Sequence, residues 1–270
     1  MFYQVDHFQS IHIMKAHFYG LAWLLLAVAL LPACNDEDEI TTPPDTTARL
    51  TFSLAHVVNG EPLVYNATRY TNAVGQEYTI EEFRFYLSNI RLRNRATGEI
   101  YIEPDSYHLV TPTNGNNMQF SLELPEVEAG TYDEVEFSIG VDNASNYSLD
   151  QIGDLDPSNN MVWDWNTGYK FLLFEGRYLP ASGGDPVGLV YHIGSDFNYK
   201  TLRFYPGEKL TLAPGQRGTL SFQVDLASIF SAPTPMDFSA HNVVMFQAVS
   251  REVAENYAQN MISLEGFSVE

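Results

Sequence analysis

One pattern dominates the chain after about residue 48: short runs in which apolar and polar side chains alternate. Alternation with a period of two is typical of a half-buried β-strand and does not fit a helix. Clusters such as Thr97-Gly98 and Pro214-Gly215 separate the runs, as turns do. The fold class predicted is all-β, a single antiparallel β-sandwich or jelly-roll-like domain. Its clearest strands are predicted over 49–56, 83–93, 118–124, 135–139 and 220–224.

Two segments depart from this rhythm. Val253, Tyr257 and Met261 recur every four residues, so we expect a short C-terminal helix over 251–261, followed by a last strand over 262–269. Residues 142–166 are rich in Asn, Asp and Ser and form a long polar loop, a kind of connection that is often functional. The carboxylates of this loop lack EF-hand spacing, so a solvated loop is favoured over a calcium site.

The sequence of the N-terminal 33 residues is typical of a targeting segment. Residues 19–31 are almost wholly apolar and follow the basic Lys15. Thirteen residues are too few for a membrane span, which needs about 20. We therefore predict a signal peptide over 1–33, with the natural start at Met14.

The apolar run ends in Leu31-Pro32-Ala33-Cys34, which resembles a lipobox, where a signal peptidase cuts before a lipid-modified cysteine. The alternative is an ordinary signal peptide with an incidental cysteine. Residues 34–47 then form an acidic, Thr- and Pro-containing tether, which is either a surface-export signal or a solvated spacer. The sequence predicts an outer-membrane lipoprotein of a Gram-negative bacterium, held by lipidated Cys34 on the periplasmic or cell-surface side. Residues 48–270 form its single folded domain.

Composition excludes several classes of protein. With 34 acidic and 14 basic residues the net charge is −20, so a nucleic-acid partner is not expected. A single cysteine excludes an internal disulfide framework and a Cys-rich metal centre. The chain lacks the G-x-S-x-G, G-x-G-x-x-G, P-loop and H-E-x-x-H signatures, and we expect that it is not an enzyme.

Metal-ligand candidates are the histidines of the folded part: His56, His108, His192 and His241. Imidazole suits copper or zinc, although a single histidine is more often a core or surface residue. The densest aromatic segment runs from Trp163 to Phe171 and contains Trp163, Trp165 and Tyr169. This segment is expected to be a buried core plug, or else an aromatic platform for a glycan.

Several motifs resemble the MbnP-like family of lipoproteins, which are related to the copper protein encoded beside methanobactin genes. They are His56 with Asn59-Gly60, the run 85–92, the W-x-W-x-x-G-Y-K-F segment 163–171, and Tyr191-His192-Ile193-Gly194. The resemblance runs from about residue 48 to the end. It departs from the family at 195–197, where Ser-Asp-Phe replaces a pair of cysteines.

The resemblance implies a β-sandwich that binds copper. Its ligands would be His56 and His192, with His241 as a third candidate, and a kynurenine made from Trp163 or Trp165, of which we favour Trp163. A partner di-haem enzyme related to cytochrome c peroxidases would carry out that oxidation.

The leading hypothesis is a lipid-anchored, extracytoplasmic copper-binding protein in copper acquisition or homeostasis. The alternative is a surface module that binds a glycan or a protein. Convergence of the His56 and His192 imidazoles would favour copper, whereas an exposed tryptophan pair would favour the glycan module.

Overall fold

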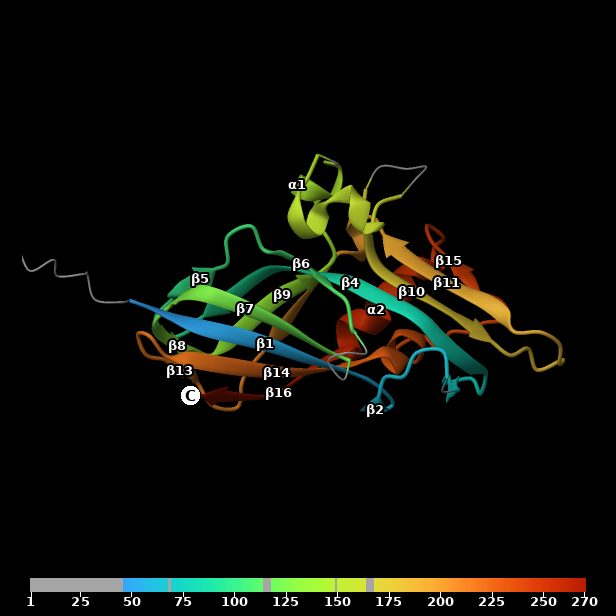
Figure 1. Ribbon diagram of the computed structural model, residues 1–270, viewed down its shortest axis with the longest axis horizontal. Helices are drawn as coiled ribbons and strands as arrows, with labels where there is room; N and C mark the ends of the chain where they lie inside the picture. Colours follow the sequence, from blue (N-terminus) through green and yellow to red (C-terminus); the bar gives the residue numbers. More distant parts are fainter. Residues whose placement is uncertain (1–45, 68, 114–117, 149, 164–167) are drawn as a thin grey trace, which may run out of the picture. The chain divides into compact units, whose positions relative to one another are not determined.

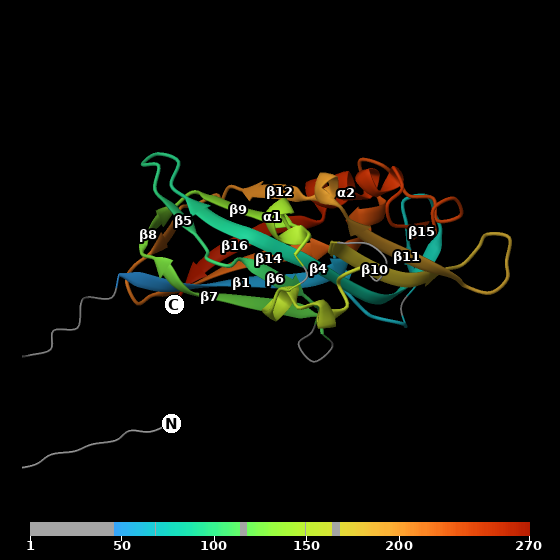
Figure 2. The same ribbon diagram turned by 90° about the horizontal axis from the view of Figure 1, so that it is seen from above.

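Two large β-sheets face each other in the computed structural model, which describes residues 46–67, 69–113, 118–148, 150–163 and 168–270 (Figures 1 and 2). The described residues lie together in one compact unit. Strands dominate it, which confirms the predicted all-β, sandwich-like fold. The part of the chain that the structure describes holds no helix that is long and apolar enough to cross a membrane.

The five-stranded sheet has the order β16-β14-β1-β2, with β7 also paired to β1. Its strands are β1 (Thr47–Val58), β2 (Glu61–Pro62), β7 (Gln119–Glu128), β14 (Arg217–Asp225) and β16 (Ile262–Val269).

The nine-stranded sheet has the order β12-β9-β4-β10-β11-β15, and β3, β5 and β6 also pair with β4. Its long strands are β4 (Glu77–Arg93), β9 (Glu134–Ile139), β10 (Lys170–Tyr178), β11 (Val187–Gly194) and β12 (Lys200–Phe204). Its short strands are β3 (Tyr70–Thr71), β5 (Ile100–Ile102), β6 (Tyr107–Val110) and β15 (Val243–Val244). A separate pair joins β8 (Gly130–Tyr132) to β13 (Leu210–Leu212).

The strand pairing is antiparallel as predicted, with two exceptions among the described strands. β1 runs parallel to β14, and β11 runs parallel to the short β15. Alternation within a strand fixes which side chains face inward, but it carries no information on the direction of a partner strand. The parallel pairs were therefore not predicted.

A β-bulge in β4 changes which residues face the core. From Phe83 to Leu87 the odd-numbered residues point inward, whereas beyond the bulge Ile90 and Leu92 do. The extra residue is Asn89, whose φ of 56° is left-handed. Asn tolerates this conformation better than most residues. Simple alternation predicts that Asn89 shares the face of Phe85 and Leu87. The bulge turns its side chain to the other face.

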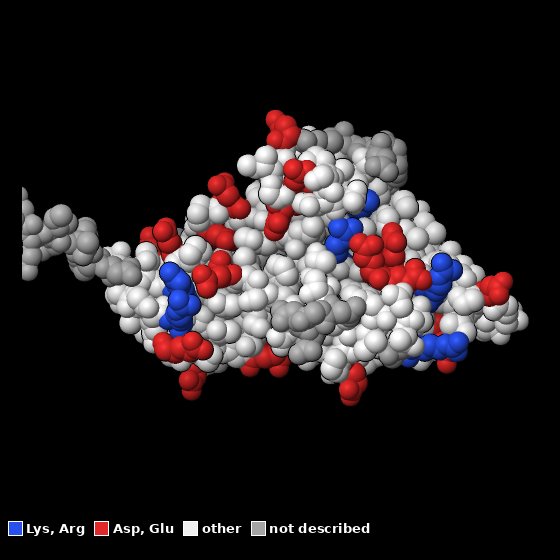
Figure 3. All heavy atoms as spheres, in the orientation of Figure 1, with Lys and Arg blue, Asp and Glu red and all other residues white. Residues whose placement is uncertain are grey.

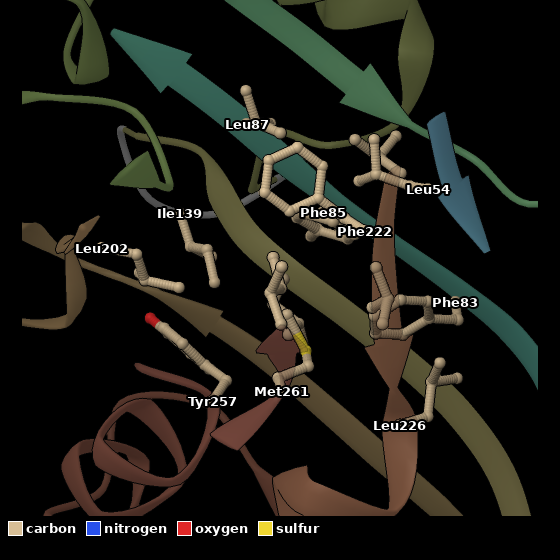
Figure 4. Close-up of a cluster of buried hydrophobic side chains, with 14 of the residues drawn as sticks. Leu54, Phe83, Phe85, Leu87, Ile139, Leu202, Phe222, Leu226, Tyr257 and Met261 are labelled. Carbon is tan, nitrogen blue, oxygen red and sulfur yellow. The ribbon is translucent and has the colours of Figure 1, made fainter. Parts of the chain in front are cut away.

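The main core lies between the sheets. Leu54, Phe85 and Phe222 meet there, and Tyr257 and Met261 contribute from the C-terminal helix region (Figure 4). Burying each such side chain contributes about 1.5–3 kcal/mol. Helix α2 (Val249–Asn260) lies close to its predicted position.

A second, smaller core covers the outer face of the nine-stranded sheet. It contains Tyr86, Leu155, Tyr169 and Leu173. The predicted polar loop supplies its lid, with α1 (Asn143–Asn146), η2 (Gly153–Leu155) and η3 (Pro157–Asn159) above β4 and β10 (Figure 1).

Candidate functional site

His56 lies near the C-terminal end of β1, and its side chain continues the inward-facing row of Leu50, Phe52 and Leu54. Only 2% of its surface is exposed, and its ring lies 6.2 Å from that of Phe83. Its Nδ1 is 2.7 Å from the carbonyl oxygen of Met118, so Nδ1–H donates and the lone pair lies on Nε2. Burial lowers the pKa of His56 to about 4, which keeps the ring neutral.

His192 lies on the other side of the nine-stranded sheet. In the pairing of β4, β10 and β11 it shares a row with Arg84 and Leu173, whereas Phe83 belongs to the neighbouring row. Neighbouring rows point to opposite faces of a sheet. Because the Phe83 row faces the main core that holds His56, His192 faces outward. The structure therefore does not bring His56 and His192 together, contrary to the shared site expected from the sequence.

His241 is exposed, in the loop before β15. Its backbone makes hydrogen bonds through both its carbonyl and its N–H group. Its carbonyl accepts from the Tyr191 hydroxyl, and its N–H donates to the carbonyl of Asp237 at 2.9 Å.

Trp163 is the neighbour that the structure gives to His192. The two rings are 6.1 Å apart, and Phe246 packs against the indole at 4.5 Å. The Lys170 ammonium lies 5.8 Å from the indole centroid. Trp163 is 5% exposed and Tyr169 is fully buried, so neither presents a face to solvent as a glycan platform. Trp165 lies outside the described residues.

Two glycines let the chain pass close to this site. A Cβ on Gly194 would lie 2.4 Å from the carbonyl oxygen of Tyr169 and 3.2 Å from Nε1 of Trp163. Gly168 has a φ of 116° and sits against Asn146, whose amide oxygen accepts from the Tyr169 N–H at 2.9 Å. The Gly residues of both family motifs thus allow Trp163 to pack beside β11.

Glu175 completes the surroundings of His192 and was not predicted from the sequence. It lies two residues from Leu173 on β10, so its side chain is on the same face, and its Oε1 is 2.8 Å from Nε2 of His192. Burial lowers the pKa of His192, although the bond to Glu175 opposes that shift. A period-two reading of β10 beside β11 would have found this neighbour, had their register been known.

Among the described residues no group of three or more His, Cys, Asp or Glu side chains is arranged to hold a metal ion. The available donors at the site are one imidazole, one carboxylate and one indole. They fit copper only in part, since an indole must be oxidised before it offers a ligand nitrogen.

The fold and this site define a class of protein: a β-sandwich in which a half-buried histidine, His192, packs beside a buried tryptophan, Trp163. A model of the MbnP family matches residues 47–246, and the chain belongs to that family. The family is associated with methanobactin and copper.

Two solved structures resemble the chain. MbnP from Methylosinus trichosporium is 16% identical, covers 70% of this chain and 80% of its own, and has a TM-score of 0.42. A Bacteroides eggerthii protein named as a cell adhesion protein is 11% identical, covers 84% of this chain and 56% of its own, and has a TM-score of 0.27. No curated protein matches the chain.

Proposed function

We propose that this chain is an extracytoplasmic copper-binding protein in copper acquisition or homeostasis, and that it binds copper at His192 beside Trp163. It is not an enzyme. The observation that carries the proposal is the 6.1 Å separation of these two rings on one face of the sheet, in a family associated with copper.

The hydrogen bond to Glu175 prepares His192 for a metal. A neutral His192 that donates its Nε2–H to Glu175 carries its lone pair on Nδ1. A carboxylate that holds the second nitrogen of a metal-binding histidine fixes the tautomer and raises ligand basicity. Imidazole is a ligand that copper accepts readily.

Charge supports the same proposal. Acidic side chains are spread over the face in Figure 3, with few basic ones. A negative field of this kind raises the local concentration of cations, although it does not select copper.

Oxidation of Trp163 would supply a second ligand. Cleavage of the indole C2–C3 bond, with C2 lost as formate, would open the five-membered ring and leave an aryl amine and a ketone, where the indole offered one N–H. Two equivalents of peroxide would supply the oxidation, with the di-haem partner that the family implies as the catalyst. We favour Trp163 over Trp165 because Trp163 packs beside His192.

The remaining parts of the proposal concern location. Lipidated Cys34 would anchor the protein to the outer membrane of a Gram-negative bacterium, on the periplasmic or cell-surface side. Multiple acyl chains on one residue give stable anchoring, whereas a single chain does not.

Copper titration of His192→Ala tests the site. We expect copper affinity to fall by at least the roughly 10- to 100-fold that the loss of an outer-shell partner costs. His108→Ala is the matched control, because His108 is also half-buried and also bonds a carboxylate, that of Glu103, at 2.9 Å. Unchanged affinity in His192→Ala, or an equal loss in His108→Ala, would refute the assignment.

Peptide mass spectrometry of protein from its native host tests the oxidation. We expect kynurenine at position 163. Intact tryptophan there in copper-loaded protein would leave ligation to His192 without this group.

A further inference from the structure

A polar pocket of about 270 Å³ opens on the outer face of the nine-stranded sheet, on strands other than the one that carries His192. We call it the Asn89 pocket. Its lining includes the following polar residues, which come from β4, β9 and the segments that follow β9 and β11: Asn89, Arg91, Glu136, Ser138, Asp142 and Tyr199.

The bulge in β4 places Asn89 at this pocket. The amide nitrogen of Asn89 donates both its hydrogens, to Asp142 Oδ2 at 2.8 Å and to the Tyr199 hydroxyl at 2.7 Å. These bonds leave Oδ1 of Asn89 as an acceptor that has no protein partner among the described residues. They also leave the hydroxyl hydrogen of Tyr199 as a donor.

The two carboxylates of the pocket are already satisfied. Asp142 accepts from Asn89, from the Tyr107 hydroxyl at 2.6 Å and from the backbone N–H of Ala144 at 3.0 Å. Burial alone would raise the pKa of Asp142, but these bonds outweigh it and hold the pKa below its ordinary value. The carboxylate is therefore ionised and fully engaged at neutral pH.

Glu136 is engaged by two arginines. Its Oε2 lies 2.6 Å from Nε of Arg203, and its Oε1 lies 3.5 Å from Arg91. Arg91 and Arg203 offset the charges of Glu136 and Asp142, so this group as a whole carries no excess charge that would attract an ion.

Apart from the remaining N–H donors of Arg91, whose charge Glu136 offsets, the groups left for a ligand are neutral. They are Oδ1 of Asn89, the Tyr199 hydroxyl, and the hydroxyls of Ser138 and Thr201, which lie 2.9 Å apart. A hydroxyl both donates and accepts, so this set matches a ligand whose own groups do the same. The volume is just below the range of ~300–1,000 Å³ for drug-sized ligands, which indicates a smaller occupant.

We propose that the Asn89 pocket binds a neutral saccharide, one sugar ring held through its hydroxyls by Asn89, Tyr199 and the Ser138–Thr201 pair. This site is independent of the proposed copper function, with which it shares no residue.

Saturation-transfer NMR with glucose, galactose, mannose and N-acetylglucosamine tests the proposal, with choline chloride and sodium acetate as a cation and an anion. We expect at least one sugar to bind and neither ion to do so. Methyl glycosides and short oligosaccharides of the bound sugar distinguish the source. Binding of the monosaccharide alone indicates a free sugar, and binding of both indicates a chain end.

Two variants tie the signal to the pocket. Tyr199→Phe removes one hydroxyl and keeps the ring that packs on Phe171. Asn89→Gly removes the amide and keeps the left-handed backbone, which glycine adopts freely. Each variant should raise the dissociation constant for the sugar roughly 3- to 10-fold, the usual effect of losing one hydrogen bond. His192→Ala, on another strand, should leave it unchanged. Absence of binding by every sugar, binding of an ion instead, or wild-type affinity in both pocket variants would overturn the proposal.

Discussion

His56 should make this protein less stable as the pH falls. Its ring is neutral in the folded state because burial lowers its pKa from 6.5 to about 4. Protonation would place a charge beside Phe83 and Phe85, with Nε2 buried and without a hydrogen-bond partner among the described residues. In the unfolded chain the same ring is hydrated and takes up its proton near its ordinary pKa.

The sign follows from proton uptake. Between the two pKa values the unfolded chain binds more protons than the folded protein, so the free energy of unfolding decreases as pH falls. The loss from about pH 7 to about pH 5 is about 2 kcal/mol, and it reaches about 3 kcal/mol near pH 4. Most carboxylates stay ionised down to about pH 5, so this window isolates histidine.

Urea unfolding of the wild type and of His56→Asn at both pH values measures the effect. The Asn amide can still donate to the Met118 carbonyl but does not titrate. The variant loses packing and is less stable at every pH, and that offset cancels in the comparison. We expect its stability to fall by about 2 kcal/mol less than that of the wild type between the two pH values. Equal losses would refute the burial argument for His56.

Three further changes have defined outcomes. A Cβ on Gly176 would lie 2.1 Å from the carbonyl oxygen of Thr79, so Gly176→Ala should lower the free energy of unfolding in urea by about 1–3 kcal/mol. Gly188→Ala is the control, because a Cβ there meets nothing within 4 Å and the free energy of unfolding should hardly change. Cys34→Ser should move the protein from the membrane to the soluble fraction, and a variant that still sediments with membranes would contradict the lipobox interpretation. Tyr169→Phe removes a hydroxyl that donates to a backbone carbonyl of the polar loop at 2.6 Å, and should cost about 1 kcal/mol and speed proteolysis of that loop, with unchanged cleavage as the contrary result.

Local patterns in the sequence located the elements well. The last strand, expected over 262–269, is β16 (Ile262–Val269), and the helix expected over 251–261 is α2 (Val249–Asn260). Both depend on periodicity within one segment, which the sequence displays directly. β4 was expected from residue 83 but begins at Glu77. The register with β10 shifts between Ile80 and Glu82, so the alternation of the first residues of β4 does not continue into the predicted run.

The site needed information that no single segment contains. The histidine motifs indicated two ligands, but only the pairing of β4, β10 and β11 shows that His192 and the contacts of His56 occupy opposite faces. Glu175 and Phe246 were not predicted for the same reason, since nothing near them in sequence points to His192. Trp163 was expected either in the core or beside a histidine, and it is both buried and adjacent to His192.

The parallel pairing of β1 with β14 also has a consequence for the order in which the chain folds. Arg49 pairs with Arg217, so one whole side of the first strand waits for residues near the end of the chain. Contacts of such long sequence separation slow folding, because a large loop must close before they form. A nascent chain that lacks β14 cannot complete its five-stranded sheet. In a protein exported as proposed here, this delay would keep the chain unfolded, and so competent for translocation, until most of it has been made.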